Sequence, residues 1–327
     1  MSLCLRVSVS KAFCLTLNQL SYTEAKDVSH RGLFKRTLLL AALCCCLLPA
    51  AARAQEAAVK TVKTFKLGET DVRVNVYERA GAAVTLFAPH HNEQGASRAG
   101  RAAVAARGGR FVEVEAFDDA GAPARRLRFR AGGRSHSVDP NRIFSANGRK
   151  CLGLPPDAEA AVEAFAENLL GLLFAPGGAR LREGETLFVA VHNNSDVEKN
   201  PPAERDGDLT AVSFVRPLRS RATFRGAFEE SAAGVYLSNA EEDEDNFIIV
   251  TEPRLLTPFA ARGFNVIVQK PAAQLRAPGC SLDDGSLSVH AAYSNIPYVN
   301  LEVDIGGGAA RQRQMLEAVY DFVKTKQ

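Results

Sequence analysis

The chain has 327 residues and a formal net charge of +3, but its positive charge is concentrated at the start. Positions 1–54 hold seven basic and two acidic residues, so the remaining chain carries a net charge of −2. That balance gives no reason to expect nucleic acid or an anionic surface as a partner, and we expect neither. The remaining 273 residues are enough for one large hydrophobic core.

The first part of the chain has the pattern of a secretory leader. A basic pair at positions 35–36 precedes an apolar run, which ends in a small-x-small cleavage signal at positions 52–54. We therefore expect residues 35–54 to be a signal peptide, with residues 1–34 ahead of it, and the mature protein to be periplasmic or secreted. An uncleaved anchor is the alternative, although the run is short for a transmembrane helix. We expect no membrane span in the mature chain.

Five of the seven cysteines lie in this leader, which leaves Cys151 and Cys280. In an oxidising compartment these two could form one disulfide. They could equally be two separate thiols, and the sequence leaves both alternatives open.

Strand and helix patterns alternate along the rest of the chain. We predict strands at 72–77, 84–87, 111–115, 185–191, 247–251, 265–269 and 298–305, a hairpin at 126–138, and helices at 97–107, 156–173, 254–262 and 309–324. This order predicts an α/β fold with a mostly parallel or mixed central sheet and helices on both faces. We expect residues 55–327 to form a single domain, with an irregular insertion at 196–245 that could form one wall of a substrate cleft.

Residue types that bind metals lie at the ends of these predicted strands. His90 and Glu93 follow one strand, His192 ends another, and Glu302 lies among apolar neighbours in the last. Open α/β sheets place their sites outside the carboxyl ends of strands. Two imidazoles and a carboxylate suit a catalytic zinc ion, which keeps its fourth position open for water. A buried carboxylate such as Glu302 is costly unless it is partnered or functional.

Four short motifs follow one another along the chain: His90-His-Asn-Glu93, Asp139-Pro-Asn-Arg142-Ile-Phe144, Val191-His192-Asn193-Asn194 and Leu301-Glu302-Val303. In this order they resemble the motifs of zinc carboxypeptidase-like hydrolases, and within these the succinylglutamate desuccinylase/aspartoacylase branch. One His-x-x-Glu is a weak signal, whereas four motifs in the right order are a strong one. The resemblance implies a carboxypeptidase-like α/β fold and one zinc ion per chain, bound by His90, Glu93 and His192.

The resemblance also implies roles for residues around the metal. Asn141 and Arg142 would hold a substrate carboxylate, because the planar guanidinium pairs with it bidentately. Arg134 would polarise the scissile carbonyl. Glu302 would be the general base that takes a proton from the attacking water and passes it to the leaving amine. We expect Asp139 to brace the Asn-Arg turn.

The predicted function is an exported zinc-dependent hydrolase that cleaves an amide bond near a free carboxylate, in an N-acyl amino acid or a short peptide. The alternatives are a metallocarboxypeptidase acting on cell-wall peptides and a non-catalytic binding protein on the same fold. His91 departs from the branch, which has a glycine there, and adds an imidazole that could act as a wrong ligand. Such departures bear on the substrate class more than on metal binding.

Overall fold

The computed structural model describes residues 57–174, 187–194, 232–239, 241–243, 245–276, 279–280, 282–305 and 308–324. Residues 56–327 form a compact unit by themselves. The expected leader and most of the expected insertion at 196–245 lie outside the described residues. Within the described ranges, no helix has both the length and the apolar character needed to span a membrane.

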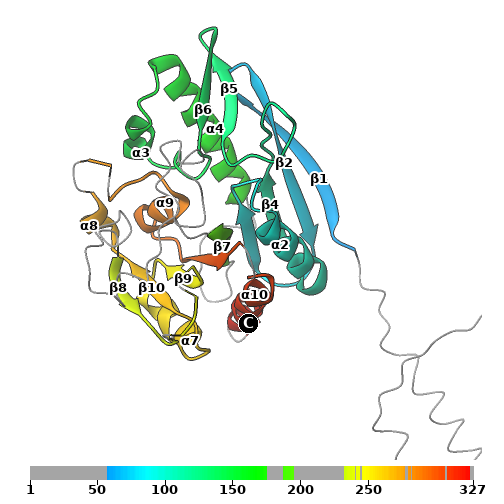
Figure 1. Ribbon diagram of the computed structural model, residues 1–327, viewed down its shortest axis with the longest axis vertical. Helices are drawn as coiled ribbons and strands as arrows, with labels where there is room; N and C mark the ends of the chain where they lie inside the picture. The colour runs from blue at the N-terminus through cyan, green and yellow to red at the C-terminus, as the bar shows by residue number, and fades with distance from the viewer. Residues whose placement is uncertain are drawn as a thin grey trace, which may run out of the picture. The chain divides into compact units, whose positions relative to one another are not determined.

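A mixed sheet of nine strands, counted over the described residues, forms the centre of this unit (Figure 1). In spatial order the strands are β1 (Val59–Leu67), β2 (Thr70–Arg79), β4 (Gly109–Val114), β3 (Val84–Ala88), β7 (Leu187–Asn194), β11 (Tyr298–Asp304), β9 (Phe247–Val250), β10 (Val266–Gln269) and β8 (Ala232–Tyr236). The central strands β4, β3, β7 and β11 run parallel. Antiparallel pairs flank them on both sides. The predicted α/β class with a mixed sheet is confirmed.

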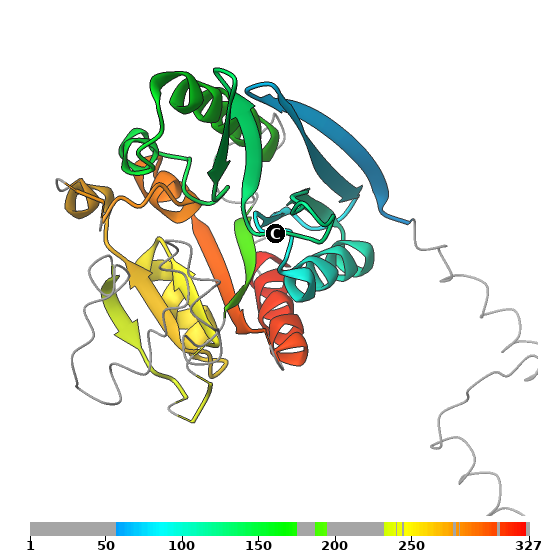
Figure 2. The same ribbon diagram turned by 45° about the horizontal axis from the view of Figure 1, so that its top comes forward.

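Helices cover both faces of the sheet. On one face α2 (Gln94–Arg107) and α10 (Ala309–Lys324) lie side by side, as both views show (Figures 1 and 2). On the other face lie α4 (Pro156–Leu173) and α9 (Leu287–Tyr293), together with the hairpin of β5 (Leu127–Ala131) and β6 (Arg134–Val138). The short elements that complete the described chain are α3 (Ala146–Cys151), the 3-10 helix η3 (Pro253–Leu255), α7 (Leu256–Ala260) and α8 (Ala272–Leu275).

Each central strand divides its side chains between these two faces. In β7, Leu187, Val189 and Val191 belong to the apolar cluster under α2 and α10, which we call the packing face. Phe188 and Ala190 belong to the cluster under α4 and α9, which we call the site face. Successive side chains of a strand point to opposite faces, so the next residue, His192, belongs to the site face.

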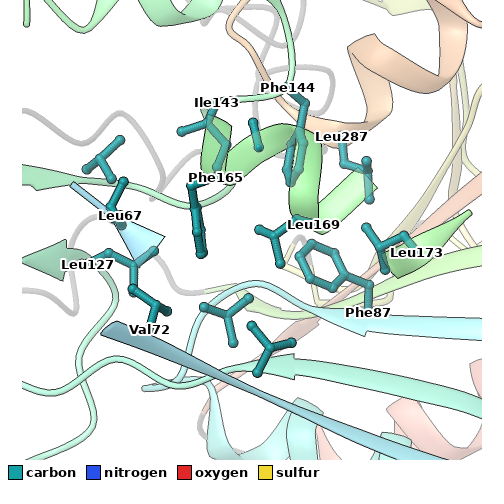
Figure 3. Packing of buried hydrophobic residues seen from close by; sticks show 14 of the residues in the cluster. Leu67, Val72, Phe87, Leu127, Ile143, Phe144, Phe165, Leu169, Leu173 and Leu287 are labelled. Carbon is teal, nitrogen blue, oxygen red and sulfur yellow. The ribbon is translucent and has the colours of Figure 1, made fainter. Parts of the chain in front are cut away.

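The site face is supported by α4. This helix begins at Pro156, a favourable residue for a first helical position, and has Asp157 and Glu159 in its first turn, where the helix dipole favours negative charge. Its apolar residues recur at helical spacing, and Figure 3 shows Phe165 and Leu169 packed within the cluster. The predicted helix at 156–173 is therefore confirmed.

Several elements were not anticipated from the sequence: β1, β8, α3, α8 and α9. The first six residues of β1 are all exposed, so the strand shows no apolar alternation. The predicted helix at 254–262 is two pieces, η3 and α7, and the helix predicted from 97 already begins at Gln94.

Cys151 and Cys280 form a disulfide, with their Cα atoms 5.8 Å apart. The open alternative of two separate thiols is thereby excluded. The bond connects the last residue of α3 to the segment that leads towards α9, so it fastens two pieces of chain above the site face.

Candidate metal centre

Three buried side chains converge at the carboxyl ends of β3 and β7. His90 follows β3, and Glu93 directly precedes α2. A backbone hydrogen bond of 3.2 Å from the Glu93 N–H to the His90 carbonyl closes the turn between them. His192 lies near the end of β7, the neighbouring parallel strand. One potential ligand atom from each of the three lies within 4.8 Å of the other two.

The donor set fits a divalent metal ion. The Nδ1 atom of His90 lies 2.7 Å from Glu93 Oε1, and the Nδ1 atom of His192 lies 3.1 Å from Glu93 Oε2, so both rings turn the same nitrogen towards one carboxylate. The Nε2 atom of His90 lies 2.8 Å from Asp139 Oδ1, which is the support that metal-binding histidines usually receive from a carboxylate. Two imidazole nitrogens and one carboxylate are a ligand set typical of catalytic zinc.

His192 is held in place through its backbone carbonyl group. The buried side chain of Gln312 on α10 donates a hydrogen bond of 3.1 Å to the His192 carbonyl. Within the described chain, the His192 Nε2 atom is buried and has no hydrogen-bond partner. The ring is therefore oriented by its strand and by the Glu93 contact.

Charges around the triad favour an ionised Glu93. Burial by itself raises the pKa of this carboxyl group, but the charges and hydrogen bonds of His90 and His192 outweigh burial and hold the pKa below its usual value. The Arg125 guanidinium adds a hydrogen bond of 2.9 Å to Glu93 Oε1 and one of 3.2 Å to Asp139 Oδ2. A carboxylate that stays ionised is available to a metal ion at neutral pH.

Arg125, and not Arg134, is the arginine that the structure places beside the triad. Arg134 is exposed and pairs with Ala131 at the tip of the β5–β6 hairpin. A strand rises about 3.4 Å per residue, so Arg134 lies roughly 14 Å along β6 from its end at Val138, where the site begins. Arg134 is not among the residues that line the pocket beside the triad, and the role expected for it at the scissile carbonyl stays a prediction. The one sequence feature that pointed to Arg125 is its position directly after the predicted loop at 118–124, because a loop can reverse the direction of the chain.

The Asn-Arg turn is connected to the triad through Asp139. Asp139 accepts a hydrogen bond of 2.7 Å from the Asn141 N–H through Oδ1, so it braces the turn as expected while also contacting His90. Asn141 Oδ1 accepts a hydrogen bond of 3.1 Å from the Leu287 N–H at the start of α9. The Arg142 guanidinium lies 3.6 Å from Asp284.

Glu302 lies beside the triad because of strand register. It is the direct partner of His192 in the parallel pair of β7 and β11, and both side chains point to the site face. Burial raises the pKa of the Glu302 carboxyl group, and the charge of His192 opposes the shift only in part. Asn300, two residues earlier on the same face, donates a hydrogen bond of 2.9 Å to Glu302 Oε1.

One pocket joins all of these groups. Its lining residues are His90, Glu93, Arg125, Asn141, Arg142, His192, Asn193, Asn194, Phe247, Ser286, Ser288, Tyr298, Asn300 and Glu302. The structure thus brings together six of the seven residues that the sequence singled out, while the seventh, Arg134, does not line the pocket and Arg125 does.

His91 turns away from this pocket. Its Nδ1 atom lies 2.7 Å from the Ala116 carbonyl oxygen, and its ring packs edge-on against Phe117 at 4.8 Å between centroids. It fastens the beginning of the loop that carries Arg125. The extra imidazole is therefore not directed at the triad as a competing ligand.

Comparisons with known proteins give weak likenesses. No protein-family model matches the chain, and no curated protein matches it in sequence. A solved metallo-carboxypeptidase from Burkholderia cenocepacia is 12% identical, with 92% of this chain and 70% of that chain covered and a TM-score of 0.37. A carboxypeptidase-type structure from Burkholderia mallei is also 12% identical, covers 91% and 68%, and has a TM-score of 0.36. An arylesterase structure is 9% identical, covers 96% and 97%, and has a TM-score of 0.29. From likenesses at this level we infer neither family nor activity.

Proposed function

We propose that this chain is an exported zinc-dependent hydrolase that cleaves an amide bond near a free carboxylate. The observation that supports it most is the pairing of His192 with Glu302 across two parallel strands. It puts a partly buried carboxylate next to a His-Glu-His ligand set, within one pocket. A metal-binding protein without chemistry has no use for a second acid at that position.

Zinc bound by the triad would supply a Lewis acid for the substrate carbonyl and would lower the pKa of water. Glu302 takes a proton from the attacking water and passes it to the leaving amine, which needs a carboxylate within hydrogen-bond reach of the reacting atoms. Asn300 orients the Glu302 carboxylate through its contact with Oε1.

Two guanidinium groups have separate tasks in this proposal. Arg142, on the wall formed by the Asn-Arg turn, pairs with the free carboxylate of the substrate. Arg125 lies beside the triad, where it stabilises the negative charge that develops on the carbonyl oxygen. The two groups line the same pocket, so a substrate must present its carboxylate and its scissile carbonyl at a fixed separation.

Two observations support export. The leader pattern at 35–54 is that of a secretory signal. The disulfide between Cys151 and Cys280 is a bond that persists in oxidising compartments and is rare in the cytosol.

A hydrolysis screen of the zinc-loaded protein tests the proposed function. Its members are N-acyl amino acids and short peptides, each with a free or an amidated carboxyl end. We expect kcat/KM for free ends to exceed that for amidated ends by roughly 100-fold, because an amidated end cannot form the ion pair with Arg142. Release of an acyl group identifies a deacylase, and release of a terminal amino acid identifies a carboxypeptidase.

Two variants make the screen specific. Arg142→Ala should abolish the preference for free ends, and Arg128→Ala, exposed on the hairpin, should leave it unchanged. Equal rates on free and amidated ends would contradict the role of Arg142. Binding of these compounds without turnover by any of them would favour a non-catalytic binding protein.

A further inference from the structure

The floor of the pocket contains one polar side chain that the proposed chemistry uses only in part. Asn300 is 6% exposed and lines the pocket on β11. Its Nδ2 atom donates to Glu302 Oε1, while its Oδ1 atom is buried without a hydrogen-bond partner among the described residues. An ionised carboxylate only accepts hydrogen bonds, so Nδ2 must face Glu302 and Oδ1 is the atom left over.

Strand register explains why there is room above this oxygen. The neighbours of Asn300 across the sheet are Ala190 of β7 and Ile249 of β9. Ala190 presents only a methyl group on the site face, and Ile249 belongs to a small apolar cluster with Phe247. An unpartnered carbonyl oxygen on an apolar floor is costly, and a bound donor would remove that cost.

The surrounding groups indicate which donor fits. Ser286 and Ser288 line the same pocket as Asn300, with their hydroxyl oxygens 3.0 Å apart. Burial keeps the pKa of Tyr298 well above its usual value, so this lining residue is also uncharged. Among the described lining residues, Glu93 and Glu302 are the carboxylates, and Asn300 already occupies one oxygen of Glu302.

These features disfavour both kinds of charged side chain. An acidic side chain would meet the Asn300 oxygen and the Glu302 carboxylate, while Arg125 and Arg142 are already assigned to the carbonyl and the free carboxylate of the substrate. A cationic side chain would bind Glu302 and compete for the proton that this residue must accept. A neutral group with N–H donors satisfies Oδ1 without either conflict.

We propose that Asn300, together with Ser286 and Ser288, forms a subsite for a neutral, N–H-donating side chain, such as a carboxamide, on the substrate residue that carries the free carboxylate. This inference rests on the proposed function for the placement of the substrate. It selects glutamine- or asparagine-type residues over acidic and apolar residues of the same size. An apolar side chain would leave the Asn300 oxygen buried and unpaired, which lowers its relative rate.

The test compares N-acetyl derivatives of glutamine, methionine and glutamate, three side chains of similar length. For the zinc-loaded protein we expect kcat/KM for the glutamine compound to exceed both others by roughly 10- to 100-fold. In Asn300→Leu and Asn300→Ala the ratio of glutamine to methionine should fall to about one or below. Both variants disturb Glu302 and will lower all rates, but a common loss cancels in the ratio.

Ile249→Val is the matched control. It shortens a neighbour of Asn300 on the site face that does not itself line the pocket, so the substrate ratio should stay as in the wild-type protein. Thermal unfolding of each variant shows whether it is folded, and Asn300→Ala serves if Asn300→Leu does not fold. An unchanged ratio in a folded Asn300 variant would overturn the subsite.

Calorimetric binding of free glutamine, methionine and glutamate separates the subsite from the hydrolase. A preference for glutamine that is lost in Asn300→Ala, without turnover of any compound, would support the subsite and contradict the proposed function. Hydrolysis of the methionine compound as fast as the glutamine compound would support the proposed function and contradict the subsite. If the protein neither binds glutamine nor turns over its derivative, the subsite is overturned.

Discussion

The two faces of β7 and β11 show how alternate residues of the same strands serve two purposes. On the packing face both strands present apolar side chains that are 1% exposed or less: Val189, Val191, Leu301 and Val303. On the site face they present His192, Asn300 and Glu302 at neighbouring register positions. The first set excludes water under α2 and α10, and the second lines a pocket.

The difference follows from the twofold alternation of a strand. A shift of one residue would exchange the faces and bury three polar side chains under α10, so the apolar set fixes the register of the polar set. The packing face therefore positions the site without touching it. Substitutions on the two faces should separate stability from chemistry, and the following predictions test that separation.

Glu302→Gln should have the largest effect, and it acts on the site face alone. We expect kcat to fall by roughly 1,000-fold, equivalent to about 4 kcal/mol, because the amide cannot accept the proton from water. Zinc content and the unfolding midpoint should stay as in the wild-type protein. Steady-state kinetics with metal analysis checks this, and unchanged turnover would contradict the assigned base.

Removal of the disulfide tests how far the site face depends on a covalent connection. The bond closes a loop with a sequence separation of 129 residues. In Cys151→Ser/Cys280→Ser we expect the free energy of unfolding to fall by roughly 3–4 kcal/mol, since the unfolded chain gains freedom. Denaturant unfolding measures this. The reduced wild-type protein is the control and should match the variant, and equal stability of oxidised and reduced wild type would contradict the prediction.

Leu301→Ala tests the packing face one residue away from Glu302. This side chain is fully buried, so we expect a loss of roughly 3 kcal/mol in the free energy of unfolding. The kcat of the folded, zinc-loaded variant should stay within about twofold of wild type, because the lost methyl groups face away from the pocket. A kcat loss comparable to that of Glu302→Gln, in folded protein, would show that the two faces are not separable.

The two arginines give the smallest pair of effects and the sharpest contrast. Arg125→Ala should lower kcat by roughly 100-fold, because it removes a positive charge beside the reacting carbonyl. Arg134→Ala, at the exposed tip of the hairpin, should change kcat by less than about twofold. Steady-state kinetics of the two variants, measured in parallel, shows which arginine acts at the reacting carbonyl. The opposite ranking would support the role that the sequence suggested for Arg134.

The contrast between these arginines also shows what could be predicted from the sequence. His90, Glu93, His192 and Glu302 were identifiable because the carboxyl ends of neighbouring parallel strands meet, which brings residues distant in the chain to one edge. Arg125 was missed because it precedes a strand, on a loop whose return path depends on contacts such as that of His91 with Ala116. Spacing along the chain carries no information about that path.

Asn300 was missed for a different reason. A strand was predicted at 298–305 and observed at Tyr298–Asp304, and a polar residue two positions before Glu302 must share its face. The signal was present, but whether an asparagine is satisfied depends on its neighbours across the sheet, Ala190 and Ile249, which only the register shows. The disulfide between Cys151 and Cys280 likewise could not be predicted without the distance between the two residues in the fold.

Zinc binding by the folded, metal-stripped protein tests the central claim most directly. Calorimetric titration, with elemental analysis of the complex, should give one zinc ion per chain for the wild-type protein and for Glu302→Gln. His192→Ala should bind weakly or not at all, because one of the three ligands on the site face is gone. A folded wild-type chain that takes up no zinc at stoichiometric ratio, or a His192→Ala variant that binds as tightly as wild type, would contradict the account.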